Sequence, residues 1–179
     1  MENKWETSPP PNIVKQKAIK EYGKFHNAKI LVETGTFRGD MIHAQKNNFK
    51  KIYSIELNES LYNMAVKRFN RQKHIKIYLG DSSKTLKEII PELDEKSVFW
   101  LDAHYSGGVT SKGDKESPIL EELKIILSSK INHVILIDDA REFIGERDYP
   151  SIEELKKFIF KKNPDCKIEI KNDLIRIIL

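Results

Sequence analysis

The chain has 179 residues, of which 39% are hydrophobic and 32% charged, and its formal net charge is +4. This length and composition suit one globular domain that buries a core, and they exclude an intrinsically disordered chain. Lysine and arginine are scattered along the chain and interleaved with 27 acidic residues, so no nucleic-acid partner is expected.

The apolar runs of the chain are short. None is long enough to cross a bilayer, and the first residues lack the apolar core of a signal peptide. The single cysteine, Cys166, suits a reducing compartment. We therefore expect a cytoplasmic protein with no membrane partner.

The N-terminal half alternates apolar runs of strand length with helical patterns. Residues 1–11, which end in three prolines, are expected to form a flexible tail, and residues 12–179 a single domain. In chain order, the pattern predicts a helix at Ile13–Phe25, a strand at Lys29–Glu33, a helix at Asp40–Asn48, a strand at Lys51–Glu56, a helix from Asn58 to Phe69, a strand at Ile75–Leu79, and a helix that starts at Ser82 or Ser83 and ends before Pro91.

The C-terminal half repeats this alternation and then departs from it. The predicted elements are a strand at Ser97–Leu101, a Gly- and Ser-rich loop at Tyr105–Ser117, a helix from Pro118 to Leu127, a strand at Val134–Ile137, a helix opened by the capping-box pair Ser151 and Glu154, and strands at Lys167–Lys171 and Leu174–Leu179. Only Asn172 and Asp173 separate the last two strands. Since a crossover helix cannot fit there, these strands must form an antiparallel hairpin.

Strands that alternate with helices predict an α/β fold with a mostly parallel sheet covered on both faces. The expected architecture is a Rossmann-like three-layer sandwich. Its seven-stranded sheet is mostly parallel and ends in a C-terminal hairpin that contributes one antiparallel strand.

Acidic residues follow the predicted strands of this sheet. They are Glu33, Glu56, Asp81, Asp102, and the pair Asp138 and Asp139. In open α/β sheets, ligands bind beyond the carboxyl ends of the strands. Acids gathered at that edge favour a cationic or hydroxyl-rich ligand.

The loop after the first strand reads Glu33-Thr-Gly-Thr-Phe-Arg-Gly39. Gly35 and Gly39 allow a tight turn and a close approach of the backbone to a ligand. A nicotinamide dinucleotide site would have G-x-G-x-x-G here, whereas this loop has G-x-x-x-G. The Glu33 carboxylate would repel a pyrophosphate and attract an ammonium group, so a nicotinamide-dependent enzyme is disfavoured.

Two further acidic residues stand where residues that bind a nucleoside are expected. Glu56 ends the second strand, where a carboxylate can accept hydrogen bonds from both ribose hydroxyls. Asp81, followed by Ser82, could reach an adenine amino group. An equally good alternative for Asp81 is that it caps the next helix.

The order of these motifs resembles that of the class I methyltransferases: E-x-G-x-x-x-G, an acid that ends the second strand, and Gly-Asp-Ser after the third. The resemblance runs from about Lys29 to Leu179 and implies S-adenosylmethionine as cofactor. It departs at Phe37, where many members have the middle glycine of G-x-G-x-G. The cofactor-binding residues that it implies are Glu33, Thr34, Gly35, Thr36, Phe37, Gly39, Glu56, Leu57, Asp81, Ser82 and Asp102.

Asp102, Asp138 and Asp139 should meet at two adjacent strand ends. Carboxylates so close are unfavourable unless they share a proton or a metal, and a hard divalent cation such as Mg²⁺ prefers oxygen ligands. This arrangement resembles the metal-dependent O-methyltransferases that act on sugar hydroxyls of natural products. That resemblance implies metal ligands at Asp102, Asp138 and Asp139 beside the acceptor.

His104 lies two residues beyond Asp102, and the two are the candidate catalytic residues. His104 could act as general base for an acceptor hydroxyl, or it could only bind its neighbours. The segment Tyr105–Ser117 could be a lid or a surface loop without a role. The other histidines, His26, His43, His74 and His133, are expected at the surface or at an edge.

The expected function is methyl transfer from S-adenosylmethionine to a hydroxyl of a small, sugar-like or natural-product-like molecule, assisted by Mg²⁺. The chain lacks the D/N-P-P-Y motif of nucleic-acid amino-methyltransferases, since it has Asp102-Ala-His-Tyr there. One alternative is a metal-independent methyltransferase with His104 as base, and another is a non-catalytic S-adenosylmethionine-binding protein. The oligomeric state stays open, a homodimer included.

Overall fold

The computed structural model describes residues 9–102 and 117–179. Its elements are α1 (Asn12–Phe25), β1 (Ile30–Thr34), α2 (Asp40–Gln45), β2 (Lys51–Glu56), α3 (Glu59–Phe69), β3 (Ile75–Leu79), α4 (Ser82–Ile89), η1 (Ile90–Glu92), β4 (Ser97–Leu101), α5 (Ile119–Ile126), β5 (Val134–Ile137), η2 (Ala140–Glu142), α6 (Ile152–Lys162), β6 (Lys167–Lys171) and β7 (Leu174–Ile178).

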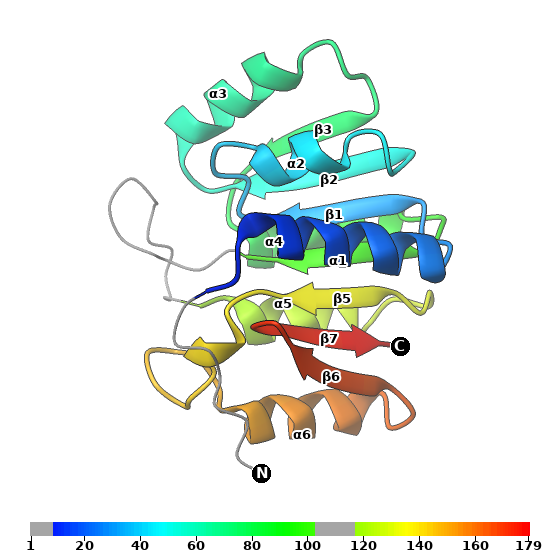
Figure 1. Cartoon of the computed structure of the whole chain (residues 1–179), viewed down its shortest axis with the longest axis vertical. Helices are drawn as coiled ribbons and strands as arrows, with labels where there is room; N and C mark the ends of the chain where they lie inside the picture. The colour runs from blue at the N-terminus through cyan, green and yellow to red at the C-terminus, as the bar shows by residue number, and fades with distance from the viewer. Residues whose placement is uncertain (1–8, 103–116) are drawn as a thin grey trace.

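The strands form one sheet in the order β3-β2-β1-β4-β5-β7-β6 (Figure 1). Strands β1 to β5 are parallel to one another, and β7 pairs antiparallel with both β5 and β6. The strand order reverses between β1 and β4, where an open α/β sheet has its ligand crevice. This confirms the predicted mostly parallel seven-stranded sheet with a terminal hairpin.

Helices cover both faces of the sheet. Successive residues of a strand point to opposite sides, so a strand that is apolar throughout needs a helical layer on each face to bury it. On β1, Ile30 and Val32 belong to a core shared with α4, α5 and α6. Leu31, between them, belongs to a second core shared with α1, α2 and α3. In Figure 1, α1 and α2 lie in front of the sheet and α4 and α5 behind it. The predicted three-layer sandwich is confirmed.

Several boundaries differ from the prediction by a few residues. The helix expected at Asp40–Asn48 ends at Gln45, and the first strand runs to Thr34 rather than to Glu33. Pro118 is the N-cap of α5 and not its first helical residue. The tail predicted at residues 1–11 lies mostly outside the described residues.

The prediction for His133 is wrong. Its side chain is fully buried and receives a hydrogen bond from the Ser97 amide, with Ser129 Oγ 3.0 Å from the other ring nitrogen. Burial lowers the pKa of His133 to about 4, with help from the charge of Lys96. This histidine is therefore a neutral part of the core.

Within residues 9–102 and 117–179, no helix combines the length and the apolar character needed to span a membrane.

Candidate functional site

Backbone hydrogen bonds align the predicted site residues along the carboxyl edge of the sheet. The Asp138 amide donates to the Leu101 carbonyl at 3.0 Å, and the Asp102 amide to the Thr34 carbonyl at 3.1 Å. On the other side of β1, the Gly35 amide donates to the Ile55 carbonyl at 3.0 Å. The ends of β5, β4, β1 and β2 therefore lie side by side, each carrying an acid.

Glu56 fixes the loop that follows β1. Its Oε2 accepts the Phe37 amide at 2.7 Å and its Oε1 accepts the Asn58 amide at 2.9 Å. The loop needs this support, because Gly35, Phe37 and Gly39 all have positive φ. Each carboxylate oxygen can accept a second hydrogen bond, so Glu56 can still receive the hydroxyls of a sugar.

Glu33 lies beneath this loop and is 1% exposed. Its Oε2 accepts the Ser54 hydroxyl at 2.5 Å, and Ser54 Oγ lies 2.6 Å from Thr36 Oγ1. Burial raises the pKa of Glu33 to about 8, and the charges of Asp102 and Glu56 add to this rise against the Ser54 hydrogen bond. A nearby cation would stabilise the ionised form, since opposite charge favours it.

An apolar rim surrounds Glu56. Phe37, Leu57 and Leu79 are large hydrophobic residues that remain 41%, 38% and 47% exposed. Leu57 follows Glu56 in the chain, Leu79 is its register partner on β3, and Phe37 is hydrogen-bonded to it. A flat apolar group bound at this rim would remove these side chains from water.

Asp81 caps α4, which is one of the two roles predicted for it. Its Oδ1 accepts the Ser83 amide at 2.8 Å and the Ser83 hydroxyl at 2.6 Å. Its side chain is 22% exposed, and Ser82 beside it is buried. The capping geometry leaves Oδ2 facing Lys84 at 3.7 Å, so a bond to an adenine remains a prediction.

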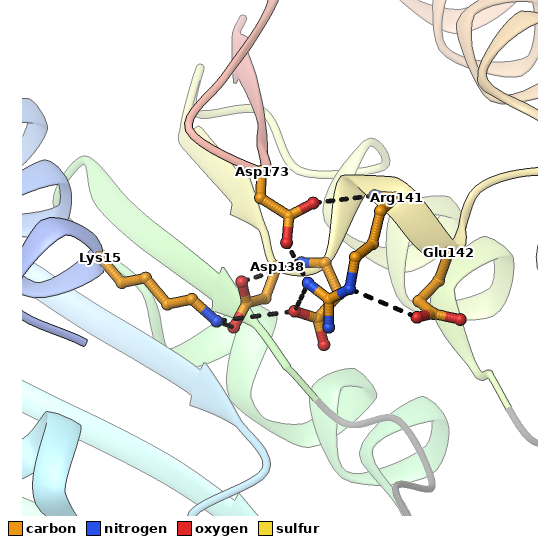
Figure 2. A network of polar contacts seen from close by, with 6 residues as sticks. Lys15, Asp138, Arg141, Glu142 and Asp173 are labelled. Atoms are coloured by element: carbon orange, nitrogen blue, oxygen red, sulfur yellow. Dashed lines mark hydrogen bonds and ion pairs between the residues drawn. The ribbon is translucent and has the colours of Figure 1, made fainter. Parts of the chain in front are cut away.

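Asp102, Asp138 and Asp139 form a carboxylate cluster at the ends of β4 and β5. They offer three ligand oxygens that lie within 4.8 Å of one another. The structure adds a residue that the sequence did not indicate: Lys15 of α1 reaches into this cluster (Figure 2). Its Nζ lies 2.5 Å from Asp138 Oδ2 and 3.6 Å from Asp139 Oδ1.

The cluster shifts the pKa of both Asp138 and Lys15. Burial raises the pKa of Asp138 to about 7, aided by the charges of Asp102 and Asp139 and opposed by Lys15. Burial alone would lower the pKa of Lys15, but the charges of Asp138, Asp139 and Asp102 reverse this, and the net pKa is raised. Lys15 is therefore an ammonium ion at neutral pH and supplies positive charge to the cluster.

The other side of the cluster is held by the terminal hairpin. Arg141 Nη1 donates to Asp139 Oδ1 at 2.8 Å and also to Asp173 in the β6–β7 turn, and its Nε lies 3.5 Å from Glu142 (Figure 2). The Arg141 amide donates to Asp173 Oδ1 at 2.9 Å. The hairpin thus positions the loop that carries Asp138 and Asp139.

A small cavity of about 20 Å³ borders the carboxylate cluster. Its lining includes Asp102, Asp138, Glu122, Phe143 and Tyr149. Glu122 of α5 is 1% exposed, and its Oε1 has no hydrogen-bond partner among residues 9–102 and 117–179. Burial raises the pKa of Glu122 to about 7, against the hydroxyls of Ser82 and Thr34. The lining of the cavity thus combines carboxyl groups with aromatic side chains.

The structure groups Asp102, Asp138 and Asp139 in one cluster, and it places the other predicted site residues that it describes along the same edge of the sheet. His104 lies outside the described residues, as does nearly all of the predicted Tyr105–Ser117 loop. Sequence reasoning missed Lys15, Ser54, Glu122, Arg141 and Asp173. Among the contacts around the candidate site, only the Asp81 cap of α4 was indicated by a local sequence pattern. Arg141, two residues after the Asp pair, was the nearest to a sequence clue.

No sequence-family model and no curated protein matches the chain. Solved structures do match in fold. The methyltransferase PaMTH1 from Podospora anserina, bound to S-adenosylhomocysteine, has 16% identity and a TM-score of 0.62, over 92% of this chain and 77% of that one. TomG from Streptomyces achromogenes, an O-methyltransferase of tomaymycin synthesis in complex with S-adenosylmethionine, has 16% identity and a TM-score of 0.64, over 97% and 82%.

The O-methyltransferase from Bacillus cereus, in complex with S-adenosylhomocysteine, has 15% identity and a TM-score of 0.66, over 97% of this chain and 82% of that one. At such identities the likeness concerns the fold. The chain therefore has the Rossmann-like fold of these methyltransferases, as the sequence motifs predicted.

Proposed function

We propose that this protein is an S-adenosylmethionine-dependent methyltransferase that methylates a hydroxyl of a small molecule. The observation that carries the proposal is Glu56. Its carboxylate is anchored by two backbone amides, retains acceptor capacity for ribose hydroxyls, and stands within the rim of Phe37, Leu57 and Leu79. A nucleoside needs this combination of a polar acceptor and an apolar face.

In this proposal, the residues at the edge of the sheet bind S-adenosylmethionine along its whole length. The positive φ of Gly35 and Gly39 gives the tight turn that a loop along the methionine backbone would need, and the buried Glu33 would be the negative partner of its ammonium. The cofactor-binding set Glu33, Thr34, Gly35, Thr36, Phe37, Gly39, Glu56, Leu57, Asp81, Ser82 and Asp102 is part of this proposal. When bound, S-adenosylmethionine supplies a methyl group on a positively charged sulfur.

The acceptor would lie beside the carboxylate cluster and the cavity lined by Phe143 and Tyr149. There the chain's own groups would orient a hydroxyl and accept its proton, with Asp102 and His104 as the proposed catalytic residues. Alignment of the acceptor with the donor would be the main contribution of the protein. A sugar-like or natural-product-like acceptor fits the acids that line this cavity, because they can bind several hydroxyls.

In the magnesium-assisted form of this proposal, Asp102, Asp138 and Asp139 would hold Mg²⁺. Three carboxylate oxygens within 4.8 Å of one another are the donor set that a hard cation prefers. A bound Mg²⁺ would lower the pKa of an acceptor hydroxyl. The metal-independent alternative is favoured by Lys15, whose ammonium already compensates the cluster.

The test of the donor site is a calorimetric titration of the full chain with S-adenosylhomocysteine. Glu56→Gln keeps the shape of the side chain but removes its charge, so we expect binding to weaken by about tenfold to a hundredfold, the effect of losing charge-assisted hydrogen bonds. The matched control is Glu59→Gln, an exposed residue three positions on, which should bind as the unchanged chain does.

Absence of binding to the unchanged chain would end the methyltransferase proposal. Binding without methyl transfer to any hydroxylated acceptor would instead favour the non-catalytic S-adenosylmethionine-binding protein. Turnover that survives a chelator would favour the metal-independent alternative.

A further inference from the structure

The place where Lys15 meets the carboxylate cluster leads to one further inference. We propose that the Lys15 ammonium and a divalent cation compete for the Asp138 carboxylate, so that helix α1 sets the metal affinity of the site. The inference rests on the magnesium-assisted form of the proposed function, but it is tested by metal binding and not by turnover.

The competition arises because both carboxylate oxygens of Asp138 already accept hydrogen bonds. Its Oδ1 accepts the Asp139 amide at 2.8 Å, and its Oδ2 accepts Lys15 Nζ at 2.5 Å. A Mg²⁺–oxygen bond of about 2.1 Å needs one of these oxygens directly. Since a bound cation and an ammonium at 2.5 Å cannot share one oxygen without strong repulsion, Lys15 must leave Asp138 when a metal binds.

Lys15 is the cation of the cluster that is free to leave. Both of its ion pairs within the described residues are with Asp138 and Asp139. Arg141, by contrast, pairs with Asp139 and is also held by Asp173 and Glu142, which lie outside the cluster. A lysine also has a flexible four-carbon stem, whereas an arginine presents a rigid planar fork. A bound metal ion would therefore displace Lys15 of α1 and leave Arg141 and the hairpin in place.

A separate observation points to a ligand at this position. Glu122 lines the same cavity as Asp102 and Asp138, is 1% exposed, and leaves Oε1 without a hydrogen-bond partner in the described parts of the chain. A buried carboxyl oxygen with no partner costs folding free energy, so a cavity lined by one is suited to a polar or cationic ligand. The cluster and Glu122 come from different elements of the fold.

The experiment measures Mn²⁺ binding to the full chain, by electron paramagnetic resonance or calorimetry, for the unchanged protein and for Lys15→Met. We expect Lys15→Met to bind Mn²⁺ at least about tenfold more tightly, because the competing ammonium is gone. Lys15→Arg, which keeps the charge, should bind as weakly as the unchanged chain. Lys20→Met is the matched control, since Lys20 is an exposed residue of the same helix.

Two further measurements keep the inference testable. Adding Asp138→Asn to Lys15→Met should abolish the gain, which would place the ion on the cluster. If Lys15→Met is unstable without metal, Mn²⁺ should restore its folding, because a ligand that binds only the native state stabilises it. The inference is overturned if Lys15→Met binds Mn²⁺ no better than the unchanged chain or fails to fold with Mn²⁺ present. Titration with S-adenosylhomocysteine tests the proposed function independently.

Discussion

At the scale of single residues, Glu122 shows how the site and the stability of the fold oppose each other. A carboxyl that is 1% exposed with an unpartnered Oε1 loses its hydration without full compensation. Residues of this kind lower stability where they stand, and native chains retain them chiefly at functional sites. Glu122 lines the cavity beside the carboxylate cluster, and its carboxyl also interacts with the hydroxyl of Thr34 at the end of β1.

We therefore predict that Glu122→Met stabilises the protein. Methionine fills a similar volume without a polar group, so the free energy of unfolding at pH 8 should rise by about 1–3 kcal/mol, the cost of an unsatisfied buried polar group. Urea denaturation measures the change. Glu88→Met, on the exposed side of the neighbouring helix α4, is the control and should stay within about 0.5 kcal/mol. A loss of stability in Glu122→Met would mean that the carboxyl is satisfied after all.

At the scale of elements, the β1–α2 loop depends on Gly39 for two separate reasons. Its φ is +75°, which disfavours any residue with a side chain, and an added Cβ would lie 2.6 Å from Phe69 Cε2. Phe69 is buried against α1 and α2, so its ring cannot turn away freely. The loop that would hold the donor is thereby locked to helix α3.

Gly39→Ala and Gly145→Ala separate these two reasons. Gly145 has a similar φ of +85°, but its added Cβ would meet nothing closer than Ser151 Cβ at 3.7 Å. We expect Gly145→Ala to lower the free energy of unfolding by about 1–2 kcal/mol through backbone strain alone. Gly39→Ala should lose a further 1–3 kcal/mol, roughly the cost of overpacking. Equal losses in urea denaturation would contradict the clash with Phe69.

At the scale of the whole molecule, buried titratable groups couple stability to pH. Burial raises the pKa of Glu33 to about 8 and that of Glu122 to about 7, from an ordinary value of 4.5. Between pH 4.5 and these raised pKa values, the folded chain holds protons that the unfolded chain has released. Raising the pH over this range therefore favours unfolding. His133 acts in the opposite direction, but only between about 4 and 6.5, where the unfolded chain binds the extra proton.

From pH 6.5 to pH 8 the effect of the carboxyls outweighs the part of the His133 effect that remains, so the free energy of unfolding should fall as the pH rises. The slope can reach about 1.4 kcal/mol per pH unit for each carboxyl that is protonated in the folded state alone. Urea denaturation at pH 6.5, 7.25 and 8 measures it. Glu122→Gln cannot titrate and should have a shallower slope, whereas stability that is constant or rises over this range would refute the assignment.

The sequence by itself determined the elements and the edge of the sheet at which the candidate site lies. Apolar runs of strand length ending in acids placed Glu33, Glu56, Asp102 and Asp138 correctly, since all four lie where buried parallel strands end. The two-residue connection at Asn172 and Asp173 likewise required a hairpin. These inferences succeed because side-chain periodicity and turn length are local properties, and parallel strands must end at a common edge.

Only the tertiary structure decided what surrounds these acids. Lys15 lies 123 residues from Asp138 in sequence, and its local pattern differs little from those of Lys17 and Lys20, which are exposed on the same helix. The order of β5 and β7 in the sheet likewise brings Asp173 to Arg141. The packing of α1 and the hairpin against the sheet fixes these contacts, and it depends on the shapes of both cores, so no short stretch of sequence contains it.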